Sequence, residues 1–169
     1  MKSEELRKLQ APLKEKYRQD AKEALVTLRA RGEVGEGVTC RVDTGKGLVE
    51  AGLHPATGGT GLAACSGDML LEALIACAGV TLQAVATALE IELRGGTITA
   101  EGDLDFRGTL GVDREVPVGF KSIRLQFDLD TDASEDQIAT LIRLTDRYCV
   151  VKQTLDNSPQ VEVQHSIQG

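Results

Sequence analysis

Two cysteines are the residues of this chain whose type and spacing could support redox chemistry. Cys77 lies in the middle of the nearly all-apolar run ALIACAGVTLQAVATAL, Ala73 to Leu89, and Cys149 follows 72 residues later in DRYCVVKQTL. A lone buried thiol in such a run usually packs as a small hydrophobic side chain. Two thiols that meet in the folded chain could instead alternate between thiol and disulfide states.

The local sequence around each cysteine predicts a different acidity for the two thiols. Cys149 follows the polar stretch TDRY and is expected to begin a new helical turn, VVKQTL. A thiol at a helix N-terminus has its thiolate stabilised by the helix dipole and by backbone amides. On the residues alone, we expect Cys149 to be the more acidic thiol. We expect Cys77 to be inert unless a cation from elsewhere in the chain reaches it.

Cys40 and Cys65, the other two cysteines, are weaker candidates. Cys65 stands at the mouth of the helix that contains Cys77, and a rise of 1.5 Å per residue places the two about 18 Å apart. A disulfide requires Cα atoms within about 7 Å, so this pair cannot be joined. Cys40 alternates with Val38 and Val42 in an expected strand, which favours a packing role.

Metal, nucleotide and Ser-His-Asp chemistry lack their sequence signatures. The two histidines, His54 and His165, have no companion ligand at the spacing of zinc sites, and no CxxC or HxxxH occurs. The GGTG stretch at 58–61 lacks the Lys-Ser/Thr ending of a phosphate-binding loop, and no Gly-x-Ser-x-Gly elbow is present. We therefore expect no metal and no cofactor, with the cysteines as the only redox groups.

Charge and composition limit which classes of binding partner and which cellular compartment we expect for this chain. A net charge of −7 argues against a nucleic-acid groove and disfavours binding to an anionic membrane surface. The N-terminal stretch MKSEELRKLQAPLKEKYRQ is charged throughout and has no apolar segment typical of a secretory signal. We therefore expect a cytoplasmic protein with reduced thiols and with neither nucleic acid nor membrane as a partner.

The elements that would position the two cysteines follow an α+β pattern. Residues 1–34 are expected to form an N-terminal helical arm, and residues 35–169 the main domain. Hydrophobic periodicity and capping residues predict, in chain order, a helix over 3–31 that Pro12 interrupts, two short strands around a Gly-Lys-Gly turn within 37–55, a helix capped by Ser66 that runs to about Glu90, strands over 97–108 and 120–132, a helix capped by Ser134, and a closing strand over 159–167.

The helix that carries Cys77 is apolar on nearly every face, so it is either buried or spans a membrane. Ala73–Leu89 contains 17 residues without a charge. A membrane span needs about 20 apolar residues. The run also contains Gln83 and is flanked by Glu72 and Glu90. We therefore expect a buried core helix.

Two cysteine-containing blocks and the segment between them resemble the OsmC/Ohr family, the osmotically inducible and organic hydroperoxide resistance proteins. SGDMLLEALIACAGVTLQAVA is similar to that family's core helix, and RLTDRYCVVKQTL is similar to its second cysteine segment. FKSIRLQFDLDTDASEDQIATLI occupies the place of the family's strand and helix between the two blocks. The resemblance covers residues 35–167 and identifies the chain as a divergent member.

The resemblance implies an OsmC-like fold in which curled antiparallel sheets surround a long buried central helix and two chains form an intertwined homodimer. It also implies a thiol peroxidase that acts in oxidative-stress defence, with organic hydroperoxides preferred. Cys77 would attack the peroxide, Cys149 would resolve the sulfenic acid as a disulfide, and an external dithiol would restore both thiols. These roles reverse the acidity ranking drawn from the residues alone. Two alternatives stay open: a dimeric, non-enzymatic binding protein for a small apolar ligand, and a thiol redox sensor.

Several positions depart from the family pattern. Gly67 stands where the family's peroxidases place a Glu ten residues before the attacking cysteine, and Asp68 lies next to it. The family's Cys-Pro pair is Cys149-Val150 here. Arg41 is the nearest candidate for the arginine that the family's Glu orients.

Overall fold

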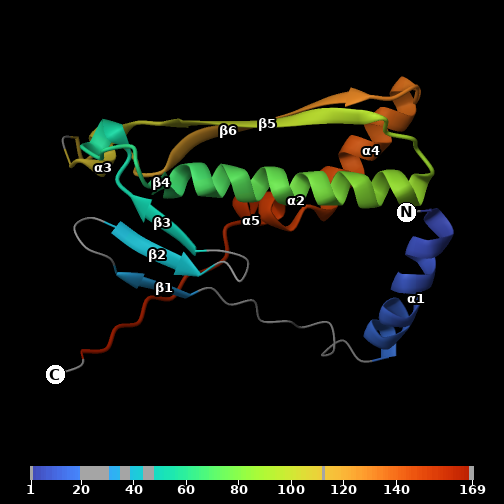
Figure 1. Cartoon of the computed structure of the whole chain (residues 1–169), viewed down its shortest axis with the longest axis horizontal. Coiled ribbons are helices and arrows are strands. Elements are labelled where there is room, and N and C mark those ends of the chain that lie inside the picture. Colours follow the sequence, from blue (N-terminus) through green and yellow to red (C-terminus); the bar gives the residue numbers. More distant parts are fainter. Residues whose placement is uncertain (1, 20–30, 35–38, 44–47, 112, 168–169) are drawn as a thin grey trace.

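The computed structural model describes residues 2–19, 31–34, 39–43, 48–111 and 113–167 of the chain (Figure 1). Its first half contains helix α1 (Ser3–Gln19), strands β1 (Arg31–Val34), β2 (Thr39–Asp43) and β3 (Leu48–Gly52), the 3-10 turn η2 (Pro55–Thr57) and strand β4 (Ala64–Cys65). Its second half contains α2 (Ser66–Leu89), β5 (Gly95–Leu104), α3 (Phe106–Thr109), β6 (Phe120–Asp130), α4 (Glu135–Tyr148) and α5 (Val150–Asp156). Helices and strands are mixed, as the sequence predicts.

The first sheet has the strand order β1-β2-β3-β4. β2 and β3 pair antiparallel, as expected for the two strands on either side of residues 44–47, which lie outside the described residues. β1 adds antiparallel to β2, whereas the short β4 runs parallel to β3 and opposes Gly52 with Cys65. This last pair brings the chain to the start of α2.

The N-terminal region differs from the predicted helix over residues 3–31. α1 ends at Gln19 and runs through Pro12 without a break in the helix. A proline inside a helix costs about 3 kcal/mol, and the many strong helix formers around Pro12 offset this. Residues 20–30 lie outside the described residues. The prediction is wrong at Arg31, which begins β1, because pairing with β2 rather than local periodicity decides its conformation.

Helix α2 carries Cys77 and is the longest helix described. The expectation that Ser66 caps it is wrong: Ser66 is the first helical residue, and Cys65 takes the N-cap position with extended backbone angles. The parallel pairing of β4 extends the chain up to Cys65, so the turn into the helix falls one residue earlier than local preference predicts. The predicted end near Glu90 is confirmed, since Glu90 is the C-cap.

Glu90 ends α2 in the left-handed conformation, with φ 58° and ψ 32°. A residue with a Cβ pays strain in this region that glycine avoids. We therefore expect Glu90→Gly to raise the free energy of unfolding by about 0.5–1 kcal/mol, measured by urea denaturation. Glu90→Ala is the control, because it also removes the exposed contact with Arg7 but keeps the strain. A Glu90→Gly protein no more stable than the Ala variant would contradict this account.

Strands β5 and β6 form a long two-stranded antiparallel ribbon that runs lengthwise along α2 (Figure 1). Both strands alternate half-buried and exposed residues, which confirms the predicted amphipathic strands. The half-buried side chains that pack toward the core include Ile98, Ala100, Ile123, Leu125 and Phe127. The ribbon thus covers one side of the helix that carries Cys77.

Helices α4 and α5 cover α2 from another side and meet at Cys149. Ser134 caps α4 as predicted, and Gln137 completes a reciprocal capping box. Cys149 is the C-cap of α4 and the N-cap of α5, which confirms that it begins a new helical turn. The change of direction between the two helices places Cys149 in the interior.

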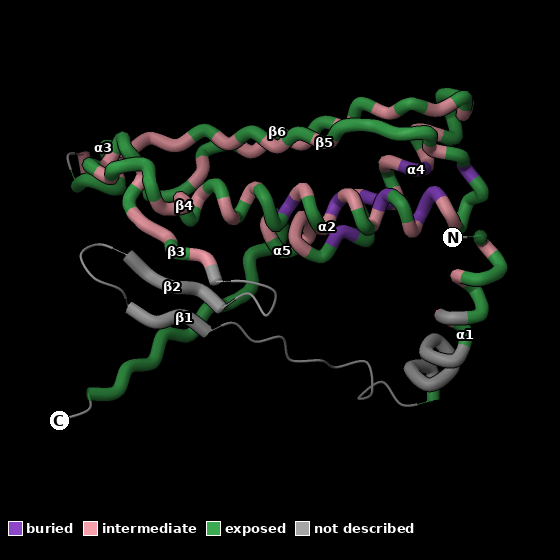
Figure 2. Tube along the Cα trace, in the orientation of Figure 1, coloured by how far each residue is buried: buried purple, intermediate pink, exposed green. Residues whose placement is uncertain are grey.

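The predicted closing strand over residues 159–167 is wrong for the single chain. The segment is extended away from the body and pairs with no strand among the described residues (Figures 1 and 2). Its apolar alternation is real, yet Val161, Val163 and Ile167 are 79%, 90% and 89% exposed. A strand forms only where a neighbour supplies hydrogen bonds, and the described part of the same chain offers none here.

Two hydrophobic clusters hold α2 in place, and Figure 2 shows the buried positions along α2 and α4. One cluster centres on the C-terminal half of α2 and Leu141 of α4, and the other joins Leu74 and Ala78 to Cys149. Among the described helices, α2 alone is long and apolar enough to cross a membrane by length and composition, a test that core helices of soluble proteins also pass. Within one chain, only 28% of its most apolar stretch is buried. The prediction of a fully buried core helix therefore does not hold for one chain by itself.

Candidate active site: a thiol pair between α2 and α5

The structure brings Cys77 and Cys149 together. Cys77, in the middle of α2, packs against the cluster that contains Cys149, and each thiol shifts the pKa of the other. Cys149 is 1% exposed and Cys77 is half-buried. Both are free thiols. This proximity arises because α2 packs against both α4 and α5, whose junction is Cys149.

The start of α5 acts on Cys77. Burial alone would raise the pKa of the Cys77 thiol, but four groups act in the opposite direction, because each can donate a hydrogen bond to the thiolate. They are the Val151 amide, the Cys149 thiol, the Val150 amide and the Thr81 hydroxyl. Together they hold the pKa of Cys77 below its ordinary value. All four groups are neutral, so this lowering does not depend on a cation.

Cys149 shows the opposite behaviour. Burial raises the pKa of the Cys149 thiol, and the neighbouring Cys77 sulfur raises it further, against a smaller opposing effect of the Lys152 amide. The sequence-based ranking of the two thiols is therefore wrong. The start of α5, which was expected to activate Cys149, acts on both thiols: the Val150 and Val151 amides lower the pKa of Cys77, while the Lys152 and Val151 amides act on Cys149 without offsetting its burial. This arrangement suits a more acidic attacking thiol and a less acidic second thiol.

Three of the groups around Cys77 were not identified from the sequence. Thr81 lies one helical turn after Cys77, a spacing that puts both side chains on one face of α2 and could have indicated the contact. Val150 and Val151 act through their backbone amides, which no side-chain motif reveals.

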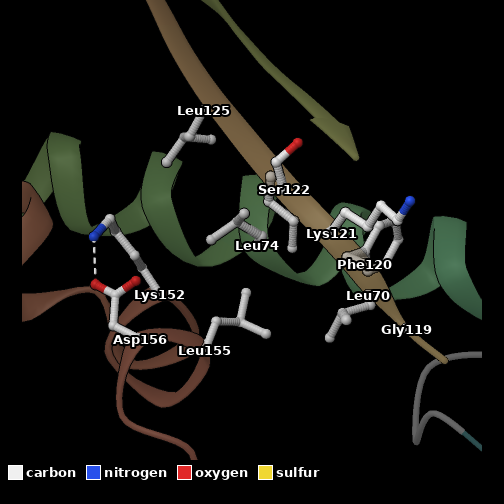
Figure 3. Close-up of a pocket in the computed structure, with 11 residues that line it drawn as sticks. Leu70, Leu74, Gly119, Phe120, Lys121, Ser122, Leu125, Lys152, Leu155 and Asp156 are labelled. Carbon is white, nitrogen blue, oxygen red and sulfur yellow. Dashed lines mark hydrogen bonds and ion pairs between the residues drawn. The ribbon is translucent and has the colours of Figure 1, made fainter. Parts of the chain in front are cut away.

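A cavity of about 580 Å³ borders the hydrophobic cluster that contains the two cysteines, and Figure 3 shows side chains that line it. Its walls include Leu74 of α2, Ile123 and Leu125 of β6 and Leu155 of α5, all of which also belong to the cluster around Cys77 and Cys149. Leu70 and Phe120 extend this apolar wall, while Lys121, Ser122, Lys152 and Asp156 supply polar groups. The cavity can therefore hold a partly apolar molecule next to the cluster that contains the thiols, and neither cysteine is among the residues that line it.

The histidines have local structural surroundings. The Nδ1 atom of His54 accepts a hydrogen bond of 3.0 Å from the Ala56 amide, and its ring stacks on Phe106 with centroids 5.0 Å apart. His165 lies in the exposed C-terminal segment. Among the described residues, no three or more His, Cys, Asp or Glu side chains gather closely enough to hold a metal ion.

A protein-family model described as OsmC-like protein matches residues 59–164, a span that includes both cysteines and most of the elements around them. The chain belongs to the OsmC-like protein family. The resemblance found in the two cysteine blocks is thereby confirmed. No curated protein matches the chain significantly.

Solved structures share the fold of this OsmC-like chain. An OsmC-like protein from Mycoplasma pneumoniae superposes with a TM-score of 0.66 at 18% identity, over 79% of this chain and 89% of the other. An organic hydroperoxide resistance protein from Elizabethkingia anophelis gives 0.64 at 17% identity, over 79% and 91%. An organic hydroperoxide resistance protein OsmC from Legionella pneumophila gives 0.61 at 20% identity, over 78% and 90%. At these identities the likeness concerns the fold.

Position 67 of the OsmC-like chain lies in the first turn of α2, away from the thiol pair along the helix. A Cβ atom on Gly67 would lie 3.5 Å from the Phe120 ring and 3.6 Å from the Cys65 sulfur. The space next to Gly67 is thus bordered by an aromatic ring and a thiol. Asp68, beside it, is exposed. The Arg41 side chain, like that of Cys40, lies outside the described residues, so both assignments stay predictions.

Three arginines on the ribbon and its connection are engaged with carboxylates. Arg94 pairs with Asp130 and Asp132, Arg107 with Asp105, and Arg124 with Asp103 and Glu101. These pairs neutralise one another at the exposed face of the ribbon rather than at Cys77. The donors that lower the pKa of Cys77 come from α2 and from the α4–α5 junction.

Proposed function

We propose that this OsmC-like protein is a thiol-dependent reductase of organic hydroperoxides that acts in oxidative-stress defence. Cys77 is the attacking thiol and Cys149 the resolving thiol. The observation that carries the proposal is that the pKa values of two neighbouring thiols shift in opposite directions. Donors at the start of α5 lower the pKa of Cys77, while burial raises that of Cys149. A nucleophile must be a thiolate at working pH, whereas a resolving thiol must wait until the first has reacted.

The reaction proceeds in three balanced steps. The Cys77 thiolate attacks one peroxide oxygen, so that a sulfur–oxygen bond forms, the oxygen–oxygen bond breaks, and the leaving alkoxide takes up a proton to become an alcohol. The Cys149 thiolate then attacks the sulfenic sulfur of Cys77. A disulfide forms, and the hydroxide that leaves takes up a proton to become water. An external dithiol returns both cysteines to thiols by exchange and becomes a disulfide itself.

The cavity next to the cluster that contains the thiols favours organic hydroperoxides over hydrogen peroxide. Leucine, isoleucine and phenylalanine side chains form most of its wall, and such surfaces bind apolar groups by excluding water. Its volume of about 580 Å³ lies within the common range for small-molecule sites, about 300–1,000 Å³. Two structural neighbours, from Elizabethkingia anophelis and Legionella pneumophila, are organic hydroperoxide resistance proteins, which supports the same substrate class.

The test is steady-state consumption of cumene hydroperoxide and of hydrogen peroxide in the presence of a dithiol. The protein is expected to consume the organic peroxide faster than an equal concentration of free cysteine does, and to prefer it over hydrogen peroxide. Consumption no faster than that by free cysteine would overturn the proposal. Saturable binding of the organic compound without consumption would instead favour a binding protein for small apolar ligands.

We further propose that two copies of the chain form an intertwined homodimer. α2 leaves an apolar face open to solvent, with Val80 74% exposed, and the C-terminal segment carries exposed, alternating apolar residues. A second copy would cover the open face of α2, and its sheet edge would give the segment over residues 159–167 a strand partner.

The dimer gives a direct prediction for solution size. Sedimentation at micromolar concentration is expected to show a species of twice 18.1 kDa, with an interface of about 2,000 Å² or more. Val161→Asp with Val163→Asp should weaken assembly, because charges would enter the paired face. The matched control is Glu162→Gln, which alters the opposite face of the same segment. A single species of 18.1 kDa would contradict the proposal.

A further inference from the structure

Thr145 occupies an unexpected place in the core. Leu141, Thr145 and Cys149 follow one another at single-turn spacing along α4, and they are 0%, 1% and 1% exposed. Leu141 belongs to one hydrophobic cluster and Cys149 to the other, so Thr145 lies between them on the stripe that faces the interior. Among the residues that the structure describes, Thr145 is the one polar residue that is buried. A valine would fill nearly the same volume.

The hydroxyl of Thr145 has no hydrogen-bond partner among the described residues. A threonine inside a helix commonly donates to the carbonyl one turn back, and Thr145 makes no such bond to Leu141. A buried hydroxyl without a partner destabilises the folded state. A donor placed in such a position is therefore available to a group that becomes a strong acceptor during function.

The sulfur of Cys149 is the nearest group along the stripe that can become such an acceptor. The Cys149 amide donates to the Thr145 carbonyl at 2.9 Å, so the helical hydrogen-bond pattern of α4 continues up to Cys149. Side chains at this spacing lie on one face, about 5–6 Å apart at Cβ, and the later one leans back over the earlier one. The Gln153 side chain donates to the Asp146 carbonyl at 2.9 Å and ties α5 to the same turn.

We infer that Thr145 is a positioning residue whose hydroxyl donates a hydrogen bond to the Cys149 sulfur when that sulfur is a thiolate. A threonine hydroxyl in a helix has two accessible side-chain rotamers, so it can turn toward Cys149 without disturbing the helix. The inference deepens the proposed function and rests on it for the resolving step. There, the Cys149 thiolate attacks the Cys77 sulfenic acid, the disulfide forms, and hydroxide leaves. Thr145 keeps its proton throughout.

The Cys149 sulfur has backbone donors in the Lys152 and Val151 amides, and their combined effect is smaller than that of burial and of the Cys77 sulfur. The hydrophobic side chains that pack against Cys149 and its cluster come from α2, the ribbon and α5. The charged groups at the junction are Lys152, Asp146 and Asp156, and the Lys152 ammonium lies 2.5 Å from a carboxylate oxygen of each aspartate. Burial raises the pKa of Cys149, so its thiolate gains from any donor that reaches it.

The test is a pH titration of the Cys149 thiol by the chemical shift of its ¹³C-labelled Cβ in the full-length reduced protein. In Thr145→Val, which removes the hydroxyl at nearly constant volume, the Cys149 titration is expected to move to higher pH. Thr145→Ser should restore the wild-type titration. Thr145→Ala removes the hydroxyl as well and keeps the test decisive if valine packs poorly. Thr140→Val is the control, since it makes the same change on another face of α4.

A kinetic measurement separates the two steps. After one equivalent of cumene hydroperoxide, Thr145→Val should form the sulfenic acid on Cys77 at the wild-type rate but form the disulfide about 10-fold more slowly, as expected for loss of a hydrogen bond to a charged sulfur. An unchanged Cys149 titration in both Thr145→Val and Thr145→Ala would overturn the inference. If the wild type consumed no peroxide, the proposed function would fail, whereas the titration would still decide the role of Thr145.

Discussion

Cys77→Ser is expected to abolish the consumption of organic hydroperoxide. A serine hydroxyl is far less acidic than a thiol, so the amides at the start of α5 cannot convert it into a nucleophile at neutral pH. Turnover with a dithiol should fall by at least about 100-fold, to the level of the reaction without protein. The measurement is the steady-state rate with cumene hydroperoxide, together with a circular dichroism spectrum to show that the fold is kept.

Cys65→Ser is the matched control for this loss. Cys65 lies on the same helix, at the N-cap of α2, and is also a partly buried free thiol. It is remote from the amides of α5, and its replacement should leave turnover within about twofold of the wild type, as for substitutions outside a catalytic group. Equal losses in the Cys65 and Cys77 variants would show that the loss of turnover is not specific to Cys77.

Cys149→Ser is expected to stop the reaction one step later. Cys77 should still reduce one equivalent of peroxide, because three of its four hydrogen-bond donors remain. The sulfenic acid on Cys77 should then persist, since the thiol that condenses with it is missing. Dimedone added after the peroxide should label Cys77 in nearly every chain of the variant, as read by peptide mass spectrometry, whereas the wild type should show little label.

The lowered pKa of Cys77 predicts how the rate of sulfenic acid formation depends on pH in the Cys149→Ser variant. Its pKa is lowered, so the thiolate persists to lower pH than that of a free cysteine. The rate of sulfenic acid formation should therefore rise with pH through an inflection below the ordinary thiol pKa of about 8.5. The reverse assignment makes a different prediction: if Cys149 is the attacking thiol, dimedone labels Cys149 in the Cys77→Ser protein.

Features encoded locally could be predicted from the sequence. The amphipathic ribbon strands, the capping box at Ser134, the end of α2 near Glu90 and the new helical turn at Cys149 all depend on neighbours within a few residues. The prediction for Cys149 correctly identified the backbone amides at the start of α5 as groups that stabilise a thiolate. It was wrong about which thiol is more acidic, because the burial of Cys149 and the packing of Cys77 against the start of α5 are tertiary effects.

Features that depend on distant or absent partners could not be predicted from local pattern. Arg31 becomes a strand residue because β2 lies next to it, and β4 moves the start of α2 by one residue through its pairing with β3. The C-terminal segment has the alternation of a strand but no neighbour within the described part of the chain. Thr145 has an ordinary place in an amphipathic helix, and only its burial between two clusters distinguishes it.

The most direct test of the central claim is the fate of the two thiols after one equivalent of cumene hydroperoxide is added to the reduced wild-type protein. Peptide mapping without reductant, followed by mass spectrometry, identifies each disulfide. The account predicts the loss of two thiols per chain and a single new intramolecular disulfide between Cys77 and Cys149, with Cys65 left as a thiol. A disulfide that involves Cys65, or retention of both the Cys77 and Cys149 thiols, would contradict it.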